Sequence, residues 1–210
     1  MNASIISWVI YDIGNTLFNA GVTGLFFPLW IITKLNGTDA TVGYTLSLAL
    51  LVSLLISPVV GALSDQTKNR KVFLGLFTLI CGISTTFIGN NSLITSLIYY
   101  GIAVTFLHLG DIFYNSMLKD VSNKNNIGII GGIGAGIGYI GAIIAIVIGL
   151  IIIENQGYPI GFTIIGNLII IFGIPILIFL KEKPQEIQNR YLKTSKSLSK
   201  RFLNQISHTL

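Results

Sequence analysis

The chain has 210 residues, of which 52% are hydrophobic and only 10% are charged, and its mean hydropathy is +0.78. A soluble domain carries about 25% charged residues. This composition therefore excludes a soluble globule and predicts an integral membrane protein. Cys81 is the single cysteine, which excludes an intramolecular disulfide. The first apolar run has no basic segment ahead of it, so we expect no cleaved signal peptide.

Six apolar runs are each long enough to cross a bilayer, which takes roughly 20 residues. We predict an all-α membrane protein in which residues 1–180 form one bundle. Its six transmembrane helices are expected at 5–33, 41–63, 72–89, 93–118, 127–153 and 158–180. Residues 181–210 are expected to form a separate polar tail.

The first run carries polar residues on one face. Asp12, Asn15 and Asn19 follow one another at spacings of three and four residues, which places them on a single side of a helix. A carboxylate in hydrocarbon costs several kcal/mol unless it finds a partner or a proton. Its presence in a membrane helix therefore indicates a functional site.

The loop after the second run is short and basic. It reads Gly61-Ala-Leu-Ser-Asp65-Gln-Thr-Lys-Asn-Arg70-Lys71, with the acidic residue at the end of the second helix and the basic pair at the start of the third.

The fourth run repeats the polar pattern of the first. His108, Asp111 and Asn115 have the same spacing and also share one helix face. We call the two sets the polar stripes.

The fifth run is rich in glycine and contains Gly136-Ile-Gly138-Tyr-Ile-Gly141, a literal G-x-G-x-x-G. A dinucleotide site would need a strand before this motif, and an apolar helix surrounds it here. With Gly132 and Gly134 upstream, the run instead gives small residues at spacings of four, which let membrane helices approach closely. We predict helix packing and no nucleotide cofactor.

The basic residues predict the orientation of the chain. All lysines and arginines except Lys34 lie in the second and fourth loops and in the tail. The positive-inside rule then places both termini in the cytoplasm, and the membrane is the cell membrane if the source is prokaryotic. The net charge of +5 therefore reflects topology, and we expect no nucleic-acid partner.

The tail has the pattern of a basic amphipathic helix suited to an anionic membrane surface. Its apolar face is Ile187, Tyr191, Leu198, Phe202 and Ile206, and its basic face is Arg190, Lys193, Lys196, Lys200 and Arg201.

Two motifs together resemble a known family. The loop resembles the G-x-L-A-D-R-x-G-R-R/K signature of the major facilitator superfamily, with matches at Gly61, Leu63, Asp65 and Arg70 and departures at Gln66, Lys68 and Asn69. The first span, Trp8-Val-Ile-Tyr11-Asp12-Ile-Gly-Asn15-Thr, resembles the W-x-x-Y-D-x-A-N-S opening of the unknown major facilitator family, which includes fungal vacuolar amino-acid effluxers linked to autophagy. Phe113-Tyr114-Asn115 and Gly138-Tyr139-Ile-Gly141 are similar to further segments of that family.

The resemblance covers residues 5–180 and implies a transporter of about twelve spans in two six-span halves. This chain matches the N-terminal half, and its tail matches the start of the central loop. The resemblance also implies that helices one and four line a cavity, across which the polar stripes would face each other. It implies further that Asp65 anchors a gate whose partners include a helix of the other half. A second six-span half, or a second copy of the chain, is the expected partner.

Secondary transport of a small polar solute, with amino-acid efflux as the example that the resemblance offers, is the function we expect. Amide groups in the stripes donate and accept hydrogen bonds, and Asp12 or Asp111 would carry a coupling proton that His108 could share. Two alternatives assign no transport role to the stripes or to the chain. The stripes could be a polar clamp between helices, or the chain could be a non-transporting subunit or a truncated half-transporter.

An intramembrane aspartyl protease is a third alternative. Tyr11-Asp12 and Leu109-Gly110-Asp111 are similar to its Y-D and G-x-G-D motifs. However, His108 replaces the first glycine, no Pro-Ala-Leu element follows, and the aspartates do not lie on consecutive spans. We therefore expect no enzyme. We also expect no metal site, because His108 and His208 are far apart and no Cys/His cluster exists.

Overall fold

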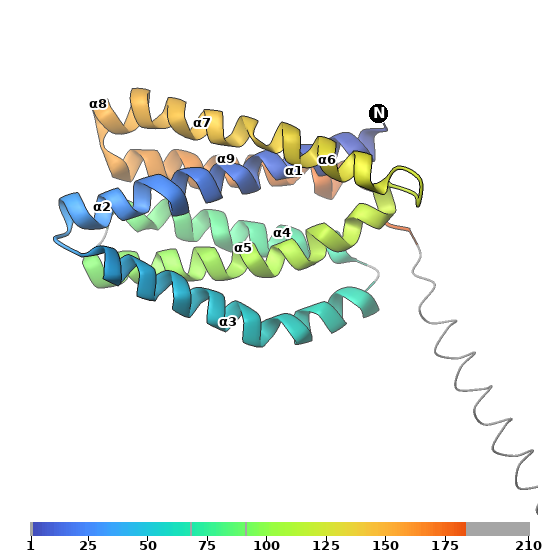
Figure 1. Cartoon of the computed structure of the whole chain (residues 1–210), viewed down its shortest axis with the longest axis horizontal. Helices are drawn as coiled ribbons and strands as arrows, with labels where there is room; N and C mark the ends of the chain where they lie inside the picture. The colour runs from blue at the N-terminus through green and yellow to red at the C-terminus, as the bar shows by residue number, and fades with distance from the viewer. Residues whose placement is uncertain (1, 68, 91, 184–210) are drawn as a thin grey trace, which may run out of the picture.

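The computed structural model describes residues 2–67, 69–90 and 92–183. The amphipathic helix predicted for the tail lies outside these described residues. Within them the chain forms a bundle of long helices that run side by side (Figure 1).

The helices in chain order are α1 (Ala3–Leu17), η1 (Phe18–Phe26), α2 (Phe27–Lys34), α3 (Asp39–Gln66), α4 (Arg70–Phe87), η2 (Ile88–Asn90), α5 (Leu93–Val121), α6 (Ile127–Gly138), α7 (Ile140–Ile148), η3 (Gly149–Ile153), α8 (Glu154–Gln156) and α9 (Tyr158–Phe179). The segments η1 and η3 are π-helical, and η2 is a short 3-10 helix.

The described residues confirm the six predicted transmembrane helices. Helical stretches long and apolar enough to span a membrane are Ala3–Lys34, Asp39–Gln66, Arg70–Phe87, Leu93–Val121, Ile127–Gln156 and Tyr158–Phe179. Several extend a turn beyond the predicted bounds, because backbone hydrogen bonding continues through polar residues such as Asp65 and Asp120 after the apolar pattern stops.

The bundle consists of two sets of three spans. The first span (α1, η1 and α2) packs against the fifth (α6, α7) and the sixth (α9), while α5 packs against α3 and α4. Contact between α4 and α9 joins the two sets. In Figure 1, α3 lies at one edge of the bundle and α6 and α7 at the other.

Glycines let the fifth span approach the first. A Cβ added at Gly141 would overlap the main-chain oxygen of Ile13, and one at Gly138 would lie 2.5 Å from Oδ2 of Asp12. Gly132 and Gly136 take no part in this contact, since a Cβ on either would meet nothing within 4 Å among the described residues. The helical turn places them on the opposite side of α6.

The two π-helical segments face each other near α2 and α8. Gly21 of η1 lies beside Ala145 of α7, and Gly149 of η3 lies beside the ring of Phe26. π-helical turns are rare and mark places where a helix departs from regular geometry. Pro28, just after η1, supplies no N–H to the preceding turn, which favours this departure.

Candidate functional site

A hydrogen bond joins the two polar stripes. Nδ2 of Asn15 on α1 donates to Oδ1 of Asp111 on α5 at 2.8 Å. The two residues lie near the middle of their spans. The structure therefore brings together, by a direct contact, two positions that are 96 residues apart in sequence.

Other members of the stripes surround this bond. Nδ2 of Asn19 donates to the main-chain oxygen of Asn15 at 3.1 Å and lies 3.2 Å from Oδ1 of the same residue. Nδ1 of His108 lies 3.8 Å from Oδ2 of Asp111, and the His108 side chain is 38% exposed. Asn19 and Asn115 are exposed as well. These accessible groups form the open side of the cluster, with Asn115 one turn beyond Asp111.

Asp12 has different surroundings from Asp111. Its carboxylate lies against Gly138 of the fifth span, next to the hydroxyl of Thr16. Among the described residues no hydrogen bond joins Asp12 to Asp111. The cluster therefore contains two separate carboxyl positions, one held by Asn15 and one beside the fifth span.

Aromatic side chains of α1 and α5 pack beside Asp12. The ring of Trp8 stacks on Tyr114 with centroids 4.6 Å apart, and its Nε1 donates to the main-chain oxygen of Tyr114 at 3.2 Å. The hydroxyl groups of Tyr11 and Thr78 share a 3.1 Å hydrogen bond. The Tyr114 hydroxyl lies near the Asp12 carboxyl. These rings close one side of the polar cluster with apolar surface.

A second charged cluster lies at the end of the bundle where α4 begins and α5 and α9 end. Nη2 of the buried Arg70 lies 2.6 Å from Oδ2 of Asp120, and its Nε lies 3.4 Å from Oε2 of Glu182. Nη1 of Arg70 also donates to the main-chain oxygen of Ser116 at 3.3 Å. The arginine therefore connects three spans, and we call this group the Arg70 cluster.

The residues just after α9 complete the Arg70 cluster. The Glu182 carboxylate accepts hydrogen bonds from the main-chain N–H groups of Arg70 and Lys71, each at 3.0 Å, at the first turn of α4. Nζ of Lys183 donates to the main-chain oxygens of Lys119 and Ser122 at the end of α5. An acid at a helix start and a base at a helix end both complement the helix dipole. The segment after α9 thus fixes the ends of α4 and α5.

The basic loop after the second span was expected to form a gate through Gly61, Asp65, Arg70 and Lys71, and these four residues do not form one contact. Arg70 is buried in its cluster, and Nζ of Lys71 donates to the main-chain oxygen of Leu180 at 3.4 Å. Asp65 is exposed at the end of α3, and no ion pair to it is formed within the described residues. Gly61 has no close neighbour among them either.

Sequence reasoning missed the acids and the base that complete the Arg70 cluster. Asp120, Glu182 and Lys183 lie at helix ends, where charged residues are ordinary, so their sequence positions alone carry little signal. A buried arginine requires an acidic partner, but nothing in the sequence shows that Arg70 is buried. The sequence also does not predict that Trp8 packs on Tyr114, because this contact depends on how α1 and α5 cross.

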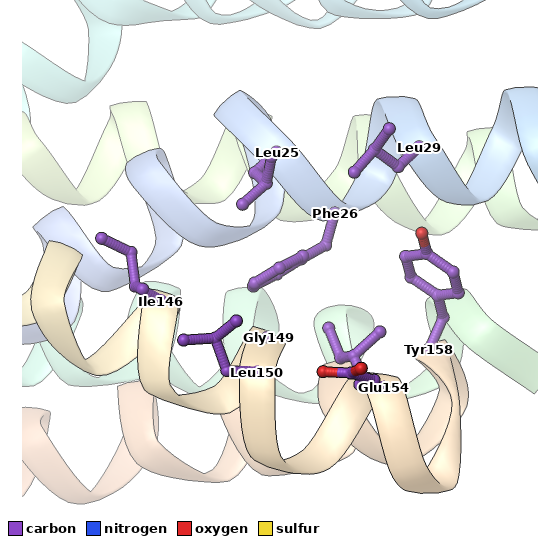
Figure 2. A pocket seen from close by; sticks show the side chains of 9 residues that line it. Leu25, Phe26, Leu29, Ile146, Gly149, Leu150, Glu154 and Tyr158 are labelled. Carbon is purple, nitrogen blue, oxygen red and sulfur yellow. The ribbon is translucent and has the colours of Figure 1, made fainter.

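An apolar pocket of about 310 Å³ lies elsewhere, between the first and fifth spans near η1 and η3 (Figure 2). Its walls include Leu25, Leu29, Ile146 and Leu150, while the Glu154 carboxylate and the Tyr158 hydroxyl are at one end. The pocket does not include any residue of the polar stripes. Its apolar lining does not suit a polar solute.

Comparisons with known proteins identify the family. The family description "Major Facilitator Superfamily" matches residues 14–208. The chain is 23% identical to an uncharacterized MFS-type transporter, YxiO, of Bacillus subtilis (strain 168), over 92% of this chain and 52% of that protein. It is 29% identical to an uncharacterized protein of Aquifex aeolicus (strain VF5), over 86% of this chain and 46% of that protein. The chain thus spans about half the length of these curated relatives.

The length of the match, nearly the whole chain, is more than a shared motif would give. The six membrane-spanning helices agree with it. The chain belongs to the major facilitator superfamily.

Proposed function

We propose that this chain provides half of the solute pathway of a secondary transporter for a small polar solute, with amino acids as the class to test first. The observation that carries the proposal is the Asn15–Asp111 hydrogen bond, which joins two spans inside an apolar bundle and lies beside accessible amide and imidazole groups. Amides and carboxylates offer both donors and acceptors, which a zwitterionic solute requires. Carboxyl and imidazole groups are also the usual proton carriers of membrane transporters.

The proposal includes a partner of six further spans. Support comes from the relatives, which are about twice as long as the matched region. It also comes from the edges of the bundle. Only 17% of the 18-residue apolar stretch of α3 and 22% of that of the fifth span are buried, against 39% for the first and fourth spans. A second six-span unit, in the same polypeptide or in another, would cover these edges and close the open side of the polar stripes.

The proposal also includes the orientation given by the positive-inside rule. The Arg70 cluster and the start of α1 lie at the same end of the bundle, since Oγ of Ser4 donates to the main-chain oxygen of Phe179 at 3.0 Å. In this orientation, that end faces the cytoplasm.

Transport is tested by flux into vesicles. The chain is reconstituted alone and together with any six-span partner, and uptake of a panel of radiolabelled amino acids is measured with and without an imposed pH gradient. We expect uptake that depends on the gradient and falls at least tenfold in Asp111→Asn and in Asp12→Asn. Asp39→Asn is the matched control, because Asp39 is exposed at the start of α3 and outside the stripes.

Wild-type flux in both stripe variants would overturn the assignment of the site. Flux that is equal with and without the pH gradient, yet lost in the variants, would retain the site and remove proton coupling from the proposal.

A further inference from the structure

The sixth span carries one polar side chain on its exposed face. Asn167 lies nine residues after the start of α9 (Tyr158–Phe179) and twelve before its end, so it is near the middle of the span. It is exposed, whereas the opposite face of α9, which includes Phe162, Ile165 and Ile169, is buried in the bundle. In a membrane, this placement leaves an amide among lipid chains.

The amide has unused hydrogen-bonding capacity. Its Nδ2 donates to the main-chain oxygen of Thr163 at 2.8 Å. Within the described residues, this is the single hydrogen bond of the Asn167 side chain. A carboxamide has two donors and two acceptor positions, so one N–H and the carbonyl oxygen remain available. Hydrocarbon cannot supply partners for them, and leaving them unpaired in lipid costs free energy.

The residues around Asn167 repeat with the period of a helix pair. Positions 160, 164, 167, 171, 174 and 178 follow one another at spacings of four and three, which is the heptad pattern of two packed helices. All of them except Asn167 are isoleucine. Ile160, Ile171, Ile174 and Ile178 are between 41% and 63% exposed, so their face has no partner in the described chain.

We propose that two copies of this chain associate through this face of α9, with the Asn167 amides hydrogen-bonded to each other. A two-fold axis beside Asn167 brings the same group of the second copy into place, so the free N–H of each amide meets the free oxygen of the other. A different helix would need an amide or hydroxyl in the same register, whereas a second copy supplies one by symmetry. A single polar residue in such an apolar seam also fixes the register of the pair.

This contact is separate from the proposed transport pathway. The buried side of α9 packs against α1 and α4, and its isoleucine face points away from both. Association through that face leaves the polar stripes on the first and fourth spans uncovered. The inference therefore stands or falls independently of the proposed function.

Cysteine cross-linking in lipid vesicles tests the geometry. In a Cys81→Ala background, single cysteines are placed at Ile160, Asn167 and Ile174, and at two control positions, Leu168 beside the seam and the exposed Leu79 on α4. After oxidation at high lipid dilution, we expect disulfide-linked dimers for the three seam positions and few for the controls. Equal cross-linking at all positions, or stronger cross-linking at Leu79, would overturn the proposal.

The role of the amide is tested by the dimer affinity, measured by energy transfer between labelled copies at increasing lipid dilution. Replacement of Asn167 by leucine is expected to weaken the dimer roughly three- to twentyfold, the range for interhelical hydrogen bonds in membranes. Asn155→Leu is the matched control, since Asn155 is also exposed and donates to the main-chain oxygen four residues earlier, but near the end of its span. Unchanged affinity in Asn167→Leu, or a wild-type chain that is monomeric at every dilution, would contradict the proposal.

Discussion

At the scale of single residues, the polar groups of this protein differ in whether the fold supplies a partner. Arg70 is 3% exposed and has two acidic partners, whereas Tyr100 is fully buried and its hydroxyl makes no hydrogen bond in the described chain. A buried charge without a partner strongly destabilises the folded state. A buried hydrogen-bond donor without a partner also destabilises it, but less. These differences give two predictions about stability.

Replacement of Arg70 by methionine should destabilise the protein by about 3–5 kcal/mol, because it removes the guanidinium group from two largely buried acids, Asp120 and Glu182. Thermal unfolding of the purified protein in detergent, or its unfolding by denaturant, measures the change. Lys119→Met removes the same charge from an exposed side chain one helix away and should change stability little. A similar loss in both variants would mean that net charge, not the buried pair, determines the effect.

Removal of the hydroxyl group should affect the free energy of unfolding differently at Tyr11 and at Tyr100. Tyr11→Phe deletes the 3.1 Å hydrogen bond to Thr78 and should cost about 0.5–1.5 kcal/mol. Tyr100→Phe deletes a buried hydroxyl that makes no hydrogen bond of ordinary geometry with the described residues, so stability should stay the same or rise. Unfolding experiments on both variants distinguish the two cases. A loss in Tyr100→Phe as large as in Tyr11→Phe would show that the Tyr100 hydroxyl is bonded.

At the scale of elements, the two faces of the fifth span differ in how closely they pack against other helices. Gly138 and Gly141 meet the first span, where no Cβ fits without displacement, while Gly136 faces outward with space around it. The same residue type therefore has opposite consequences for packing on the two sides of one helix. The contact positions Gly138 beside Asp12, so it also shapes the polar cluster.

Gly141→Ala should separate the first and fifth spans and reduce stability, because the added methyl group overlaps main-chain atoms of Ile13 and Leu17 that cannot move aside alone. Gly136→Ala should instead stabilise the helix by about 0.5–1 kcal/mol, since alanine restricts the unfolded chain and meets no neighbour. The melting temperatures of the two variants in detergent provide the comparison. If both substitutions have the same sign, the assigned packing face is incorrect.

At the scale of the whole molecule, the spans alternate in direction, so the loop before α3 and the loop before α6 lie at opposite ends of the bundle. In the orientation that we propose from the positive-inside rule, the end with the basic loops faces the cytoplasm. Asp39 and Lys124 are exposed, one at each end, and can report this orientation.

In a Cys81→Ala background, a cysteine at Asp39 should react with a membrane-impermeant maleimide added to intact cells. A cysteine at Lys124 should react only after the cells are made permeable. Mass shifts of the purified protein measure the labelling. The reverse pattern would invert the topology, and the proposed cytoplasmic position of the Arg70 cluster would then be lost.

The sequence by itself determined the membrane class, the six spans and the presence of polar stripes on the first and fourth, because hydropathy and helical period are properties of each segment alone. The comparisons then showed the superfamily that the motifs had indicated.

Only the tertiary structure decided that Asn15 binds Asp111, that Arg70 is buried against Asp120 and Glu182, and that Gly138 and Gly141, but not Gly136, meet the first span. The physical reason is that all six spans are apolar, so hydrophobicity does not select which helix faces which. That choice depends on close packing between particular side chains from distant parts of the chain.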